Sequence, residues 1–148
     1  MARKVFVGSD HAGFALKQSI VDSLRNAGHD VEDLGPESAV SCDYPHYAQK
    51  VCDRVLAEEA LGILICGTGI GMSMAANRIP GIRAALCTCE FHARATRQHN
   101  NANVLCLGAR IIGVELAQAI VEAFLGASFE GGRHQRRIDM INLPGQAG

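Results

Sequence analysis

The stretch Ile63-Leu-Ile-Cys-Gly-Thr-Gly-Ile-Gly71 decides the fold. Apolar residues run up to Cys66, a glycine-rich turn follows, and small residues at helical spacing continue through Met72-Ser-Met-Ala-Ala-Asn77. This pattern predicts a buried parallel strand, a tight turn and the N-terminus of a helix. Because the first N–H groups of a helix have no intrahelical partner, we expect an anion site at this turn with Cys66 at its mouth.

Three familiar phosphate-binding motifs differ from this turn. A dinucleotide fingerprint needs glycine at position 72, where Met72 stands, and a P-loop needs Gly-Lys-Ser/Thr, but no lysine follows Gly71. A cysteine phosphatase loop would carry arginine six residues after the cysteine, which is again Met72. The alternative interpretation is a turn whose glycines serve only its backbone angles, with Cys66 as a small buried hydrophobe.

Composition narrows the class of protein. The chain has 148 residues and a net charge of -1, so we expect one domain over residues 1–148 and neither nucleic acid nor membrane as a partner. No apolar run is long enough for a transmembrane helix, and the N-terminus does not resemble a secretory signal. Six cysteines without a Cys-x-x-Cys pair favour reduced thiols and a cytoplasmic location.

Strand and helix patterns alternate along the whole chain. We expect strands at 4–8, 31–34, 63–66, 82–87 and 104–107, and helices at 14–24, 48–56, 72–77, 90–100 and 114–125. A polar loop is expected at 35–47, a short basic segment at 133–137 and a frayed tail from Pro144. The prediction is a single-domain α/β, Rossmann-like three-layer sandwich with a five-stranded parallel sheet and a C-terminal helical tail.

Reactive or polar side chains follow three of these strands. Right-handed crossovers place every strand-to-helix turn at the same sheet edge, where open α/β sheets bind ligands. The side chains that we expect to converge at this carboxyl edge are Asp10, His11, Cys66, Thr68 and Arg110.

Several of the candidates also have an ordinary structural interpretation. Asp10 precedes a helix and has the residue type of a cap, and His99 with Asn100 ends a helix, where histidine suits the dipole. Arg133 and Arg137 lie four residues apart, so a helix would place them on one face. That face is either solvated or a fork that holds a phosphate.

Six motifs together resemble the type B ribose-5-phosphate isomerase family and span nearly the whole chain in order. They are Gly8-Ser-Asp-His-Ala-Gly-Phe14, Asp43-Tyr-Pro-His-Tyr47, Cys66-Gly-Thr-Gly-Ile-Gly71, Arg97-Gln-His-Asn-Asn101, Asn103-Val-Leu and Glu130-Gly-Gly-Arg-His-Gln-Arg-Arg137. The resemblance implies an aldose–ketose isomerase of the pentose phosphate pathway that interconverts D-ribose 5-phosphate and D-ribulose 5-phosphate. The wider family also includes isomerases of galactose 6-phosphate and allose 6-phosphate.

The resemblance also implies residue roles. Cys66 would be the base that moves a proton between C1 and C2, since Met72 stands where other branches carry a glutamate. His99 would open the sugar ring with help from Asp10, and Thr68 belongs to the same catalytic set. The implied substrate-binding residues are Gly67, Gly69 and Gly71 at the anion hole, Asn100 at the sugar oxygens, and His11, Arg110, Arg133 and Arg137 at the phosphate.

The chemistry fits these roles. Isomerisation passes through an enediolate, whose negative oxygen needs preorganised donors, and a helix N-terminus makes thiolate available for the proton transfer. We therefore expect neither a metal nor a cofactor. Two alternatives stay open: the same chemistry on a six-carbon aldose phosphate, and a flavodoxin-like module that binds phosphate or nucleotide without catalysis.

Helix geometry predicts that the site is shared between subunits. The helix at 90–100 starts at the carboxyl edge and runs back for about 16 Å, at 1.5 Å per residue. His99 and Asn100 should therefore lie far from Cys66 of their own chain. A two-fold homodimer, alone or within a tetramer, would bring them to the Cys66 of a partner.

Overall fold

Five parallel strands form one sheet in the computed structural model, which describes residues 2–142. Their order across the sheet is β2-β1-β3-β5-β4. The strands are β1 (Lys4–Ser9), β2 (Asp30–Asp33), β3 (Leu61–Cys66), β4 (Ala84–Leu86) and β5 (Val104–Gly108). The predicted five-stranded parallel sheet is confirmed.

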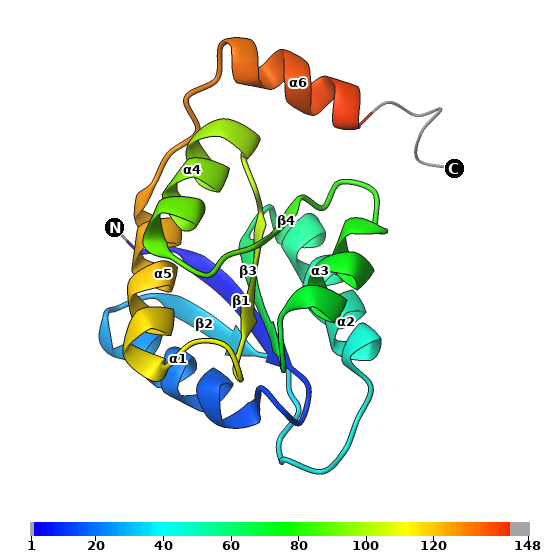
Figure 1. The fold of residues 1–148 in the computed structure, drawn as a ribbon, viewed down its shortest axis with the longest axis vertical. Coiled ribbons are helices and arrows are strands. Elements are labelled where there is room, and N and C mark those ends of the chain that lie inside the picture. The colour runs from blue at the N-terminus through cyan, green and yellow to red at the C-terminus, as the bar shows by residue number, and fades with distance from the viewer. Residues whose placement is uncertain (1, 143–148) are drawn as a thin grey trace.

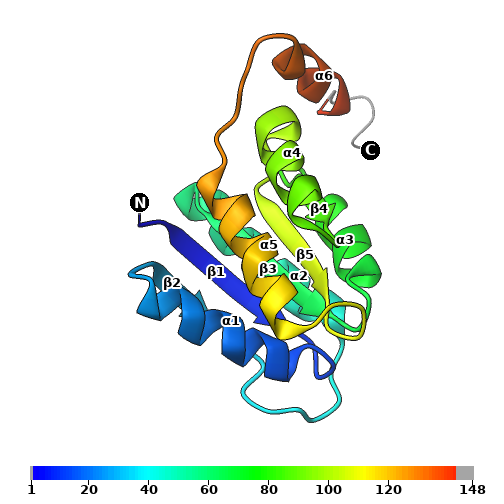
Figure 2. The same cartoon turned by 60° about the vertical axis from the view of Figure 1, so that its left-hand side comes forward.

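Helices cover both faces of this sheet (Figure 1). They are α1 (Phe14–Asn26), α2 (Tyr44–Glu58), α3 (Ile70–Asn77), α4 (Glu90–Asn100), α5 (Val114–Gly126) and α6 (Arg133–Ile141). Helices α1, α4 and α5 lie on one face and α2 and α3 on the other, whereas α6 lies beyond the end of α4 (Figures 1 and 2). Within residues 2–142, no helix has the length and apolar character to cross a bilayer.

The central strand β3 is buried along its whole length because both sheet faces are covered. Its side chains alternate between two cores. Ile63 and Ile65 pack with α1 and α5, whereas Leu64 and Cys66 pack with α2 and α3. The two-residue period of a strand thus points Cys66 toward α3, on the α2 face of the sheet.

The strand order reverses between β1 and β3. From β1 the chain first adds β2 on one side and then crosses to β3 on the other side. The helices that follow these two neighbouring strands, α1 and α3, then lie on opposite faces of the sheet. Such a switch point opens a crevice at the carboxyl edge, between the turns that carry Asp10 and Cys66.

Several element boundaries differ from the sequence prediction. Helix α2 begins at Tyr44 rather than at residue 48, because Pro45 fits the first helical turn, where its missing N–H has no partner to lose. Helix α3 begins at Ile70, directly after Gly69, and β4 spans only Ala84–Leu86. The basic segment extends into a helix that ends at Ile141. The predicted frayed tail from Pro144 lies outside the described residues.

Candidate active site

The glycine turn after β3 is built around the sulfur of Cys66. Cys66 is the last residue of the strand, and only 5% of it is exposed. The backbone N–H of Gly69 donates to Cys66 Sγ at 3.2 Å. This contact requires Gly69 to adopt the left-handed backbone conformation, with φ of 80°, which glycine accepts without strain.

The first turn of α3 has its own local acceptors. Thr68 Oγ1 accepts the N–H of Ile70 at 3.2 Å. A side chain at position 71 would place its Cβ 2.7 Å from the ring of Tyr44, so glycine lets Tyr44 lie over this turn. The N–H groups of Gly69 and Ile70 are therefore engaged by Cys66 and Thr68, and an incoming oxyanion competes with these side chains for them.

Asp10 and His11 lie beside this turn because β1 and β3 are neighbours. The N–H of Asp10 donates to the carbonyl of Ile65 at 3.1 Å. Asp10 Oδ1 accepts the N–H of Gly13 at 3.1 Å, so the carboxylate closes the turn that leads into α1. The N-cap of α1 is Gly13, so the interpretation of Asp10 as the helix cap is wrong. His11 Nδ1 accepts the N–H of Cys42 at 3.2 Å, which ties the histidine to the loop before α2.

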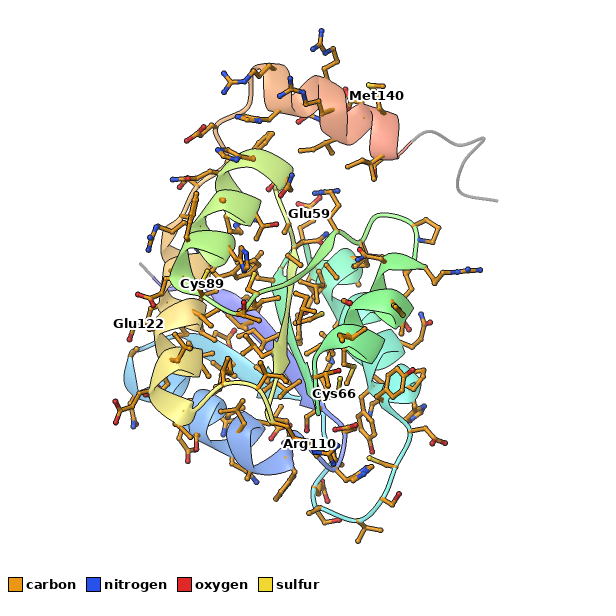
Figure 3. All side chains as sticks on the ribbon, viewed as in Figure 1. Glu59, Cys66, Cys89, Arg110, Glu122 and Met140 are labelled. Carbon is orange, nitrogen blue, oxygen red and sulfur yellow. The ribbon has the colours of Figure 1, made fainter. Side chains whose placement is uncertain are left out.

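The turn after β5 completes this edge. The N–H of Arg110 donates to the carbonyl of Gly67 at 2.9 Å, and the Arg110 guanidinium lies against Gly67. A Cβ on Gly108 would meet the Thr68 carbonyl oxygen at 2.5 Å, so glycine permits direct backbone packing of the two turns. Figure 3 shows Cys66 and Arg110 close together at one end of the molecule. The predicted residues that meet here are Asp10, His11, Cys66, Gly67, Thr68, Gly69, Gly71 and Arg110.

His99 and Asn100 lie at the opposite edge of the same chain, as expected. They end α4, and the carbonyl of the nearby Asn103 accepts the N–H of Gly62 near the start of β3. Cys66 stands at the other end of that strand. Five residue steps of about 3.3 Å separate Leu61 from Cys66, so the two groups are on the order of 16 Å apart along the strand.

Two arginines, the half-buried Arg83 and the buried Arg97, fix the turn that carries His99 and Asn100. Arg83 Nε donates to the carbonyl of Asn100 at 3.0 Å, and Arg97 Nη1 donates to Asn101 Oδ1 at 3.2 Å. Burial lowers the pKa of both guanidinium groups. Arg83 and Arg97 also line an adjoining cavity of about 500 Å³. Because cations stabilise the carbonyl groups at a helix C-terminus, the two arginines support this turn.

Helix α6 holds the two remaining predicted residues. Arg133 and Arg137 are exposed, whereas His134 and Ile138 form the buried side of the helix. Helix α6 packs on α4, so its arginines belong to the same end of the molecule as His99 and not to that of Cys66. The structure thus divides the predicted site residues into two groups.

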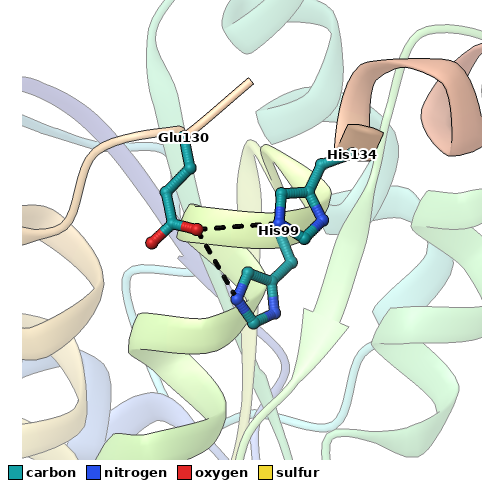
Figure 4. Close-up of side chains that lie close together, drawn as sticks. All are labelled: His99, Glu130 and His134. Carbon is teal, nitrogen blue, oxygen red and sulfur yellow. Dashed lines mark ion pairs between the residues drawn. The ribbon is translucent and has the colours of Figure 1, made fainter. Parts of the chain in front are cut away.

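Two residues without a predicted role join the second group. The ring of His134 stacks on that of His99, with centroids 4.5 Å apart and an interplanar angle of 15°. Glu130 Oε1 lies 3.6 Å from His134 Nε2 and 3.9 Å from His99 Nε2 (Figure 4). The signal in the sequence was the motif Glu130–Arg137, which holds both residues, but nothing in it indicated the contact with His99.

Three other thiols are buried more deeply in the two cores than Cys66. Burial raises the pKa of Cys52 and of Cys87 to about 12, with smaller contributions from the neighbouring Asp53 and Cys89 respectively. Burial also raises the pKa of Cys106 well above its usual range. These three thiols stay protonated at neutral pH, which leaves them without a role in proton transfer.

Comparison with known proteins gives one consistent result. The family model described as Ribose/Galactose Isomerase matches residues 5–141. The chain is 51% identical over 140 residues to ribose-5-phosphate isomerase B of Escherichia coli, and the match covers 94% of each chain. It is 49% identical over 144 residues to the probable ribose-5-phosphate isomerase B of Mycoplasma genitalium, with 95% of each chain covered.

Solved structures agree with these relatives. A ribose 5-phosphate isomerase B from Thermotoga maritima superposes with a TM-score of 0.94 at 53% identity, over 96% of this chain and 99% of that one. The Mycoplasma genitalium enzyme with bound ribulose-5-phosphate superposes with a TM-score of 0.91 at 48% identity, over 96% and 95% of the two chains.

Proposed function

The chain belongs to the ribose/galactose isomerase family, and we propose that it interconverts D-ribose 5-phosphate and D-ribulose 5-phosphate. The observation that carries this proposal is Cys66 Sγ at the carboxyl edge of the sheet, with the Gly69 N–H at 3.2 Å. Aldose–ketose isomerisation needs a base beside donors that stabilise an enediolate. The glycine turn offers both within one short segment.

In the proposed reaction, the Cys66 thiolate removes the proton from C2 of the open-chain aldose. The electron pair moves to the carbonyl, and negative charge on the sugar oxygens is stabilised by N–H groups of the glycine turn. In this proposal the hydroxyl of Thr68, which is exposed and accepts the Ile70 N–H, exchanges a proton with these oxygens. Cys66 then returns the proton to C1, and the ketose forms.

Ring opening requires a second acid–base group, which the Cys66 edge of the same chain does not supply in this proposal. The partner subunit's His99 fills this role in a homodimer, assisted by Asp10 of the Cys66 chain, while the partner subunit's Asn100 binds sugar oxygens. The separation of on the order of 16 Å within one chain supports the shared arrangement. The assembly is the dimer itself or a tetramer built from it.

In this proposal the phosphate group of the substrate is bound by side chains from both chains. His11 and Arg110 lie at the Cys66 edge, and the partner subunit's Arg133 and the partner subunit's Arg137 approach with α6. Charge-assisted contacts of this kind orient the distant carbon that loses its proton. The reaction needs neither a metal nor a cofactor, and the six free cysteines support a cytoplasmic location.

The direct test is turnover of ribose 5-phosphate in the presence of a chelator, with ketose formation as the readout. We expect steady isomerisation without added metal. A protein that binds the sugar phosphate without turning it over would be a non-catalytic module, which contradicts the proposal. A parallel panel of five- and six-carbon aldose phosphates should give the highest kcat/KM with ribose 5-phosphate.

A further inference from the structure

A cluster of two imidazoles and one carboxylate lies where three segments meet. His99 ends α4, Glu130 lies in the connection after α5, and His134 is in the first turn of α6. The N–H of Glu130 donates to the carbonyl of Gln98 at 3.0 Å, which fixes this connection against α4. One ligand atom from each of the three side chains, His99, Glu130 and His134, lies within 4.8 Å of the other two (Figure 4).

We propose that His99, Glu130 and His134 bind a divalent transition-metal ion of the zinc class, and that the bound ion inhibits the enzyme by engaging His99. The inhibition rests on the proposed function, in which His99 opens the sugar ring. Binding of the ion does not rest on it, since it depends only on the three side chains.

The distances are close to those of a metal site. Zinc bonds to nitrogen and oxygen of about 2.1 Å place tetrahedral ligand atoms about 3.4 Å apart. Glu130 Oε1 already lies 3.6 Å from His134 Nε2 and 3.9 Å from His99 Nε2. The side chains of His99 and Glu130 are 45% and 52% exposed, so both can rotate toward an ion. The stacked rings must also open from their present 15° angle so that both lone pairs point at one ion.

The ligand types select the ion. Two imidazoles with one carboxylate suit zinc and its neighbours, whereas magnesium and calcium prefer oxygen alone. An imidazole binds a metal ion in its neutral form. Arg133 and Arg137 also repel a cation, and we therefore expect an ion that exchanges with solvent rather than a permanent structural ion.

Occupation of the site has two consequences. The Nε2 lone pair of His99 is engaged by the metal, so the ring cannot accept or donate the proton that ring opening requires. The ion also ties the first turn of α6 to the end of α4, a contact that otherwise depends mainly on His134 and Ile138. Inhibition should therefore follow occupancy and be reversed by a chelator.

Binding is tested first, on the metal-stripped full-length protein. Calorimetry with zinc and visible absorption with cobalt should both report one ion per chain. His134→Gln and Glu130→Gln should each weaken binding by more than about tenfold, since even indirect partners of a metal commonly contribute that much. His92→Gln is the matched control: His92 lies in α4, as His99 does, but outside the cluster, so this variant should bind zinc normally.

Activity is tested second, with the same proteins. Zinc should inhibit the unmodified enzyme and His92→Gln, and a chelator should restore both. His134→Gln should resist zinc: its turnover with zinc should equal its own turnover in chelator. Cys66→Ala should bind zinc normally, because the site contains no thiol.

Three results would overturn the inference. If the protein binds neither zinc nor cobalt, the proposed metal site does not exist. If His134→Gln binds zinc as tightly as the unmodified chain, the ion is held elsewhere and the proposed site is wrong. If zinc binds through the cluster but leaves turnover unchanged, the proposed inhibition is wrong. A chain that binds zinc through the cluster yet never isomerises ribose 5-phosphate contradicts the proposed function and leaves the metal site standing.

Discussion

The two edges of the sheet carry two differently built groups of site residues. At the carboxyl edge, Cys66 and Asp10 are buried, and the turns around them are joined by backbone hydrogen bonds such as that from Arg110 to Gly67. At the amino edge, His99 in the last turn of α4 and Arg137 in the middle of α6 are exposed. The residues of the first group are held in place by hydrogen bonds within one chain, whereas the second group has polar side chains that face solvent.

This difference shows which parts of the site one chain determines alone. The strand ends and glycine turns hold the proposed base within hydrogen-bond distance of its donor, because the sheet behind them is rigid. In the second group, the exposed arginines have a binding role only when the Cys66 edge of another chain packs against them. The predictions below either break one of the two groups or sharpen the contrast between them.

Removal of the base should have the largest effect. Cys66→Ala is expected to lower kcat by about 10²- to 10⁴-fold while substrate binding changes little, because loss of a general base has this magnitude. Steady-state kinetics with a separate binding measurement checks it. Cys89→Ala, a partly exposed cysteine at the start of α4, is the control and should retain turnover. Near-normal kcat in Cys66→Ala would remove Cys66 from the mechanism.

Loss of a phosphate contact should come next. Arg137→Ala is expected to raise KM for ribose 5-phosphate about ten- to a hundredfold, since a charge-assisted hydrogen bond is worth roughly 1.5–3 kcal/mol. With unphosphorylated ribose the loss should shrink. Arg136→Ala, about 100° round the same helix, controls for the change in net charge. Equal losses on both sugars would show that Arg137 does not bind the phosphate.

Disturbing the packing of the two carboxyl-edge turns should have a smaller effect, on stability. A Cβ at Gly108 would lie 2.5 Å from the Thr68 carbonyl oxygen, so Gly108→Ala forces backbone to shift. We expect a loss of about 1–3 kcal/mol in the free energy of unfolding, as for other overpacked sites. Gly126→Ala, at the end of α5 where no atom lies within 4 Å, should lose no stability in the same denaturant titration. Equal stabilities of the two variants would contradict this account of the turns.

The smallest expected effect is a pH dependence of α6. Partial burial, followed by the charges of His99 and Arg133, lowers the pKa of His134 from 6.5 in the folded chain. The unfolded segment then binds a proton more readily, so docking of α6 weakens as pH falls below about 6.5 and is favoured above it. Hydrogen exchange of α6 amides between pH 5.5 and 7.5, in chelator, should show this change. His134→Gln should flatten it, and an unaltered profile would exclude His134 as the source.

The glycine turn could be predicted because its determinants are local. An apolar run that ends at Cys66 and glycines at fixed spacing require a buried strand and a tight turn, and the sheet topology then assembles the carboxyl edge. The start of α2 was misplaced because Tyr44-Pro45 is equally typical of a loop and of a first helical turn. Local pattern alone does not separate these two uses of proline.

The cluster at the amino edge could not be predicted because its partners are distant in sequence. His99 and His134 meet only after the chain has crossed α5 and turned back at Gly131-Gly132. The turn at Asn101, with φ of 45°, likewise depends on Arg83, which lies just before β4. The separation of His99 from Cys66, by contrast, followed from helix length and direction alone, and the structure confirms it.

The central claim is that each active site takes Cys66 from one chain and His99 from another. An equal mixture of inactive Cys66→Ala and inactive His99→Asn chains, unfolded and refolded together, tests it most directly. Half of the dimers should be mixed, and each mixed dimer should contain one intact site, so about a quarter of the unmodified activity should return. A mixture that verifiably exchanges subunits and yet stays inactive would contradict the shared site.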